Sequence, residues 1–302
     1  LQAALRDPDE FVRGWAIELA NDRRAATAEV LRRFVEMAVA DPSPVVRRYL
    51  ASAIQRVPGA TAWDLIDALS RHGEDREDRN IPLLLWDGLA QRMPSDLERS
   101  LGVAARTALP QLADYVWWYA ATLEGPGLGA AVAEVGRSSG EIQRRRLAGL
   151  ALALDSRGPV PGLDAWKPVG AALYDNADPR VRRQAERVGA LLGDGSVLPR
   201  LRVDLANRNA DPDARNHALD VLGREPDRDS LTVFLGLLDD PAFRLRVIPL
   251  LGAFDSPAVA QGLLGRFESW PPPERSAALA TLTRRSSYAL ELLKAVHEGR
   301  IK

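Results

Sequence analysis

An Asp-Pro dipeptide recurs along this chain and limits the folds that it can adopt. Its five copies begin at Asp7, Asp41, Asp178, Asp211 and Asp240. In each copy an arginine and apolar residues at helical spacing follow the dipeptide. An aspartate can accept hydrogen bonds from the unpaired N–H groups of a helix's first turn, and proline fits the first helical position, where no N–H is needed. Each copy therefore predicts a turn and a new helix that the aspartate caps.

The spacing of these copies predicts a repeat. The interval from Asp7 to Asp41 nearly equals the interval from Asp178 to Asp211, and the interval from Asp211 to Asp240 is slightly shorter. The first two intervals are close to the period of about 34 residues that several helical repeats share. The long interval from Asp41 to Asp178 is close to four such periods. The middle of the chain is therefore expected to contain degenerate repeats rather than a different domain.

These signals predict an all-α fold. We expect a right-handed α-solenoid of about eight helical hairpins, built as a single domain over residues 1–302. The repeats should be degenerate in residues 91–177 and clearer in residues 178–302. Both ends should expose an apolar face, whereas a complete array ends in polar capping repeats. We therefore interpret the chain as a piece that is truncated at both ends.

Apolar periodicity predicts which face of each helix is buried. In the first helix this face comprises Val12, Trp15, Ala16, Leu19 and Ala20. In the third helix it comprises Val46, Leu50, Ala53, Ile54 and Val57. Neighbouring hairpins are expected to bury these faces against one another.

Composition excludes several classes of function. The chain has no cysteine, so it can hold no zinc–thiolate site, disulfide, cysteine nucleophile or covalently attached haem c. Its 40 Lys and Arg residues against 41 Asp and Glu residues give a net charge of −1, which does not favour nucleic acid as a partner. The sequence has no apolar run of about 20 residues, the length that a transmembrane helix needs. No catalytic motif accompanies the three histidines, so we expect no enzyme activity, cofactor or metal in this chain.

A dense polar segment leads into an apolar one between Arg71 and Trp86. Its polar side chains include His72, Glu74, Asp75, Asp78 and Asn80. Oxygen-rich sets of this kind can bind a hard cation, although the spacing matches no EF-hand loop. A contact patch for a protein partner is a second hypothesis. The favoured interpretation is a solvated turn in which Asp78 or Asn80 caps the next helix.

The most aromatic stretch runs from Tyr115 to Tyr119 and contains Trp117 and Trp118. On one helix the two tyrosines share a face, whereas the two tryptophans point elsewhere. We expect most of these side chains to pack between repeats. The alternative is that Trp117 and Trp118 form an exposed contact for a partner protein, because tryptophan often dominates interface energetics.

Arginines that follow the Asp-Pro turns predict a ladder of ion pairs. The arginines concerned are Arg13, Arg47 and Arg182. A guanidinium can form a planar, bidentate pair with a carboxylate. Acidic residues are as frequent as arginine, so we expect Asp–Arg pairs between stacked helices rather than a basic patch. Replacing Arg47 with alanine should then lower the melting temperature.

The order of an aspartate, a Val-Arg pair and small residues resembles HEAT repeats. The copies that carry this order are Asp41…Val46-Arg47, Asp7…Val12-Arg13 and Asp178…Val181-Arg182. In the copies at Asp211 and Asp240, Ala214-Arg215 and Leu245-Arg246 replace Val-Arg. The resemblance implies a scaffold or a protein-interaction role without catalysis.

Residues 7–90 resemble one family in particular. The motifs follow in the order Asp7-Pro8…Val12-Arg13-Gly14-Trp15, Asp41-Pro42…Val46-Arg47 and His72…Asp78-Arg79-Asn80-Ile81-Pro82…Trp86. This order is similar to the HEAT-containing region of planctomycete-type membrane-bound dehydrogenases, which are haem-binding fusion proteins. The resemblance implies a secreted or periplasmic parent protein. In that family a dehydrogenase-like β-propeller precedes the repeats, and a c-type cytochrome module with Cys-x-x-Cys-His follows them.

Within such a parent protein the repeats would space and orient the flanking modules, and haem c would belong to a C-terminal module outside this chain. A free-standing adaptor that binds a protein partner on the concave face of the array is the alternative. An enzyme or a DNA-binding repeat protein is the third and most distant hypothesis.

Overall fold

The computed structural model describes residues 1–22, 26–123, 125–157, 164–224 and 226–301. Within these ranges the regular structure consists of 18 α-helices and five short 3₁₀ helices, without a strand. Packing divides the chain into two compact units, Leu1–Gly193 and Asp194–Lys302. That residues 1–302 form a single continuous domain stays a prediction.

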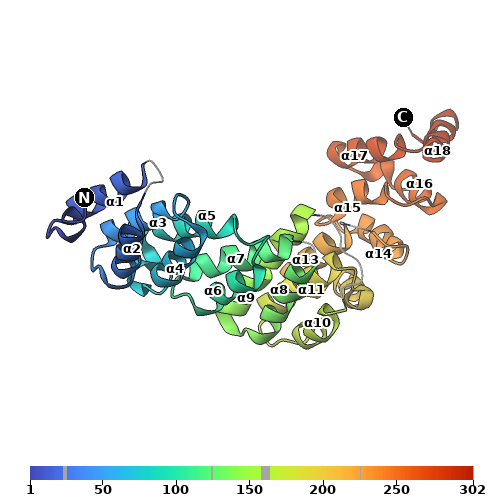
Figure 1. The fold of residues 1–302 in the computed structure, drawn as a ribbon. Helices are drawn as coiled ribbons and strands as arrows, with labels where there is room; N and C mark the ends of the chain where they lie inside the picture. Colours follow the sequence, from blue (N-terminus) through green and yellow to red (C-terminus); the bar gives the residue numbers. More distant parts are fainter. Residues whose placement is uncertain (23–25, 124, 158–163, 225, 302) are drawn as a thin grey trace. The chain divides into compact units, whose positions relative to one another are not determined.

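The first unit contains eleven α-helices among its described residues. Their bounds, with those of two 3₁₀ helices, are η1 Ala4–Arg6, α1 Glu10–Asn21, α2 Ala28–Ala40, α3 Pro44–Ala53, α4 Gly59–Leu69, η2 Gly73–Glu77, α5 Ile81–Ala90, α6 Leu97–Arg106, α7 Pro110–Thr122, α8 Pro126–Arg137, α9 Gly140–Arg157, α10 Trp166–Tyr174 and α11 Pro179–Leu191. Helices α1, α3, α5, α7, α9 and α11 pack side by side in that order, and we call them the odd layer (Figure 1). Helix α2 packs beside α4, and α8 beside α10, in a second layer.

The second unit contains seven α-helices among its described residues. Their bounds, with those of three 3₁₀ helices, are η3 Gly195–Val197, α12 Leu198–Ala206, α13 Pro212–Leu222, α14 Ser230–Gly236, η4 Leu237–Asp239, α15 Arg244–Leu251, α16 Pro257–Leu264, η5 Phe267–Ser269, α17 Pro272–Leu282 and α18 Ser286–His297. Helix α12 packs on α13 and α14, α15 on α14 and α17, and α18 on α16 and α17. Among the described residues, seven successive helix pairs from α2–α3 to α14–α15 pack as hairpins, and α17 packs on α18. The predicted all-α solenoid is confirmed.

The core follows the predicted apolar period in α3 but not in α1. All five residues predicted to be inward from the third helix are buried, among them Val46 and Leu50. In α1 the prediction was wrong for the large side chains, because Val12, Trp15 and Leu19 are 40%, 58% and 64% exposed. The buried face of α1 instead comprises Gly14, Ala16, Ile17, Ala20 and Asn21. Apolar residues surround most of this helix. Gly14 lies on the buried side against Tyr49 of α3, and Val12, Trp15 and Leu19 lie on the other side.

Side-chain caps explain where the helices begin, and they correct two of the predicted caps. Asp178 and Asp211 cap α11 and α13 as predicted, through the N–H groups of Arg180 and Asp213. The caps of α1 and α3 are Asp9 and Ser43 instead. Asp7 and Asp41 accept hydrogen bonds from the N–H groups of those two caps, at 2.9 and 3.0 Å. In these copies the Asp-Pro aspartate orders the turn, and the residue two positions later caps the helix.

The last copy departs further from the predicted helix start. Asp240 accepts a hydrogen bond from the Ala242 N–H at 3.1 Å, and α15 begins only at Arg244. Asp240 therefore shapes the turn before α15 and is not its cap.

Candidate interaction surface

Arg13 begins a ladder of ion pairs between successive helices of the odd layer. Its Nε lies 2.8 Å from Asp41 Oδ2, and its Nη2 lies 2.9 Å from Asp41 Oδ1. The remaining guanidinium nitrogen donates to the carbonyl of Asp7 at 2.9 Å. This side chain thus ties α1 to the turn that precedes it and to the turn that precedes α3.

Arg47 repeats this arrangement one unit later. Its Nε and Nη2 each lie 2.6 Å from an oxygen of Asp75, and its Nη1 donates to the Asp41 carbonyl at 3.0 Å. The side chains of Arg47 and Asp75 are both only 2% exposed. The hydrogen bonds to Asp75 raise the pKa of Arg47 above its already high ordinary value. Asp75 was predicted in an exposed polar patch, and that placement was wrong because its carboxylate is buried within the ladder.

Arginines of the later repeats occupy related positions. Arg144 lies 2.7 Å from Asp178, and Arg182 donates to the Asn176 carbonyl at 3.0 Å. The Arg180 N–H and the Arg144 guanidinium both donate to the Asp178 carboxylate and hold its pKa below the usual range. Arg182 therefore makes the same contact with the backbone six residues earlier as Arg13 and Arg47 do.

In the second unit the ladder positions differ from those predicted. Arg215 is buried, lies 2.7 Å from Asp240 and stacks over the ring of Phe243 at 4.3 Å. Arg244 donates to the Leu238 carbonyl, six residues earlier, at 2.7 Å. Arg246, which aligned with Val-Arg in the sequence, instead lies on the surface beside Asp220 at 2.6 Å. The equivalent arginine is therefore Arg244, two positions earlier than predicted.

The other residues of the predicted polar patch have defined roles in the turn. His72 Nε2 lies 2.8 Å from the Ala38 carbonyl, and its Nδ1 lies 2.8 Å from Glu74. The hydrogen bond with His72 lowers the pKa of the Glu74 carboxyl. Asp78 accepts hydrogen bonds from the N–H groups of Asn80 and Ile81, as expected for a residue that begins α5. In the described part of the chain, no group of three or more His, Cys, Asp or Glu side chains could hold a metal ion.

The aromatic stretch of α7 is divided between the core and the surface. Trp117 is only 6% exposed, so it packs inside as expected, and the alternative of an exposed partner contact is wrong for this residue. Trp118 is half-buried and belongs to a cluster around Trp86, whose ring centroid lies 6.4 Å from that of Trp118. Tyr115 and Tyr119 also pack against Trp86, at 5.7 and 5.5 Å. These rings join α5 to α7 and leave Trp118 with a partly exposed edge.

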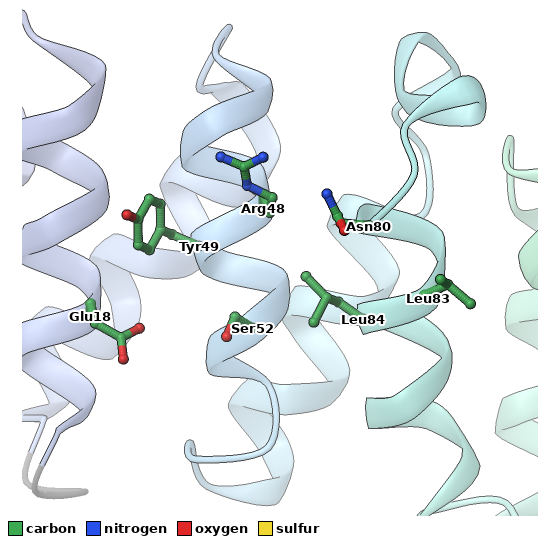
Figure 2. Close-up of a pocket in the computed structure, with 7 residues that line it drawn as sticks. All are labelled: Glu18, Arg48, Tyr49, Ser52, Asn80, Leu83 and Leu84. Carbon is green, nitrogen blue, oxygen red and sulfur yellow. The ribbon is translucent and has the colours of Figure 1, made fainter.

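Helices α1, α3 and α5 carry a cleft that the sequence did not predict, and we call this cleft, together with the exposed apolar side chains of α1 and α5, the free face. Its exposed large apolar side chains are Phe11, Val12, Trp15, Leu19 and Leu83. A cleft of about 460 Å³ is lined by Glu18, Arg48, Tyr49, Ser52, Asn80, Leu83 and Leu84. Figure 2 shows these side chains on neighbouring turns of the three helices, with Arg48 and Asn80 near the same end of the cleft. The signal in the sequence was that apolar residues lie on nearly every side of α1, more than one packed face of a helix can bury.

The charges around this cleft are unevenly paired. Glu18 is bridged by Arg56, whose guanidinium nitrogens lie 2.9 and 3.2 Å from its two oxygens. Within the described residues, no carboxylate pairs with Arg48 and no hydrogen bond engages its guanidinium. The cleft therefore combines apolar walls, one neutralised acid and one uncompensated positive charge.

The repeated hairpins and the turn arginines are features of a helical-repeat array, and the comparison with known families agrees. Residues 199–283 match the family described as HEAT repeats. The chain contains a HEAT-repeat region. The match covers the copies at Asp211 and Asp240, which depart most from the HEAT pattern in sequence. In the structure Arg215 and Arg244 make contacts of the ladder type in these copies, Arg244 two positions earlier than the sequence alignment places it.

No curated protein matches the chain. Among the described residues, no helix is both long and apolar enough to cross a membrane. A HEAT-repeat region supports a scaffold or an interaction role, and the free face is the surface of the first unit that best fits such a role.

Proposed function

We propose that this chain is a non-catalytic helical-repeat scaffold that binds a protein partner on the free face. The observation that carries the proposal is that α1, which lines the Arg48 cleft through Glu18, exposes four large apolar side chains, while Leu83 is exposed in the cleft lining. Aromatic residues, together with arginine, are enriched at protein interfaces and often dominate their energetics. Trp15 and Leu19 project from a helix whose opposite side is already packed, and no described residue of the chain buries them.

A second cleft, of about 750 Å³, lies between α2 and α4 on the other layer. It is wider, and Val39 is its exposed large apolar residue. We favour the free face because five large apolar side chains are exposed on it, against one, Val39, in the lining of the second cleft. The two surfaces can be distinguished by experiment.

The test is site-specific photo-cross-linking in the native host. The full chain would carry p-benzoylphenylalanine at Leu83 on the free face or, as a matched control, at Val39 on α2. A cross-link to one partner from Leu83, absent from Val39, is expected. Binding of that purified partner should then weaken with Trp15→Ala while the melting temperature stays unchanged. A cross-link from Val39 alone, or from neither position, would contradict the proposal.

A more specific role follows from the resemblance of residues 7–90 to the planctomycete-type proteins. We propose that the scaffold connects a propeller dehydrogenase-like module to a c-type cytochrome module in a secreted or periplasmic protein. Because this chain has no cysteine, the proposed haem c would be attached in a flanking module. Sequencing the parent gene tests this role. A Cys-x-x-Cys-His motif downstream of the repeats supports it, and a parent gene without the motif contradicts it.

A further inference from the structure

We infer that the Arg48 cleft recognises a carboxylate side chain in a short extended peptide segment of the partner. This inference rests on the proposed function and adds the chemistry of the occupant. The nearby arginines Arg13, Arg47 and Arg56 each have a carboxylate partner. Arg48 has none among the described residues, although it lines the cleft.

The surroundings of Arg48 favour an anionic group of modest charge. The acid in the cleft lining, Glu18, already pairs with Arg56, so the local charge balance is positive by one. A single guanidinium matches one carboxylate through two parallel hydrogen bonds. The exposed Asn80 side chain, which no described residue hydrogen-bonds, lies near Arg48 and adds amide donors for the same group (Figure 2).

The walls of the cleft define the rest of the occupant. Tyr49, whose ring lies 6.5 Å from that of Trp15, forms an apolar side over α1 and α3. Leu83 and Leu84 form another on α5. The axes of helices in contact lie about 8–10 Å apart, so a segment that crosses α1, α3 and α5 spans roughly 16–20 Å. About six residues of extended chain cover that length. The occupant is therefore a segment of about six residues with Asp or Glu between apolar side chains.

A peptide display library tests this inference even while the partner is unidentified. The full chain would be used to select from random 12-residue peptides, and the tightest peptide would be synthesised. We expect selected sequences to share an Asp or Glu flanked by apolar residues. In titrations followed by calorimetry, Arg48→Ala should weaken binding roughly ten-fold to a hundred-fold, the range for a charge-assisted hydrogen-bonded pair. Arg48→Lys should restore part of the affinity.

Two controls show whether the carboxylate contacts Arg48 itself. Arg76→Ala removes an exposed arginine of η2 that does not line the cleft, and it should leave the affinity unchanged. Changing the peptide's Asp to Asn, or Glu to Gln, should weaken binding to the unaltered chain but add little in Arg48→Ala. Circular dichroism should show equal helicity and melting temperature for all variants, since Arg48 has no described partner to lose.

Several results would overturn the inference. They are a library that enriches no peptide, a consensus without an acidic residue, and an affinity that Arg48→Ala does not change. None of them affects the cross-linking result at Leu83, so the proposed function could stand while the carboxylate specificity fails. If the Leu83 cross-link is absent, the proposed function fails whatever the library returns.

Discussion

Arg47 and Asp75 show what the ladder contributes at the scale of a residue. Two charges are removed from water, and their hydrogen bonds to each other and to the Asp41 carbonyl compensate for that loss. Such a pair adds little net stability compared with well-packed apolar side chains, but breaking it is costly because the remaining charge stays buried. The pair therefore fixes the relative position of two turns more than it strengthens the core.

Arg47→Ala should consequently destabilise the chain. The loss of unfolding free energy should be about 3–5 kcal/mol, the usual cost of leaving one buried charge unpaired. Urea unfolding followed by circular dichroism measures it. Arg76→Ala is the matched control, because Arg76 lies next to Asp75 in sequence but is 66% exposed, and its effect should stay within about 0.5 kcal/mol. The double variant Arg47→Met/Asp75→Leu should recover much of the loss. Equal stability of Arg47→Ala and Arg76→Ala would show that the pair does not hold the repeats together.

The carboxylate of Asp178 makes part of the stability depend on pH. Its pKa is lower in the folded chain than in the unfolded chain, owing to the Arg180 N–H and Arg144. The unfolded state therefore binds more protons, and the stabilising contribution is present above about pH 4 and is lost as the pH falls through the folded-state pKa. Asp178→Asn should reduce stability at pH 7 and flatten its decline below pH 4. Urea unfolding at pH 7, 5, 4 and 3 checks this, and an unchanged slope in the variant would argue against the assignment.

At the scale of an element, the contact between α3 and α5 depends on one glycine. A Cβ placed on Gly88 would lie 2.4 Å from Cγ2 of Ile54, which is fully buried. The absence of a side chain at Gly88 thus allows the two helices to approach closely. The next contact, between α5 and α7, has no arginine pair among the residues described; the Thr107 hydroxyl and the Ala108 N–H both donate to the Ser70 carbonyl, each at 2.9 Å.

Gly88→Ala should destabilise the first unit by about 1–3 kcal/mol, the usual cost of overpacking a well-filled core. Gly129→Ala is the control, since Gly129 also lies inside a helix but has open space where a Cβ would be added. That change should stabilise the chain by about 0.5–1 kcal/mol through helix propensity. Thermal unfolding of both variants measures the difference. Two variants with the same sign of effect would contradict the close packing of α3 on α5.

At the scale of the whole molecule, local signals were sufficient for the architecture but not for the surfaces. The Asp-Pro copies and apolar periods predicted the hairpins, because both act within one helix and its turn. Asp75 follows Asp41 at the same spacing as Asp41 follows Asp7, but no proline comes after it, so it was assigned to a solvated loop. Val12, Trp15 and Leu19 were assigned to the core for a different reason: which side of α1 is covered depends on its packing against η1 and α3, and no local pattern encodes that choice.

Hydrogen exchange on the full chain tests whether the partner binds on the free face, away from the other layer and the second unit. Amide exchange would be followed with and without a saturating amount of the partner identified through the Leu83 cross-link. We expect new protection in α1, α3 and α5, with little change in α2, α4 or the second unit. Protection confined to α2 and α4, or to residues 194–302, would contradict binding on the free face.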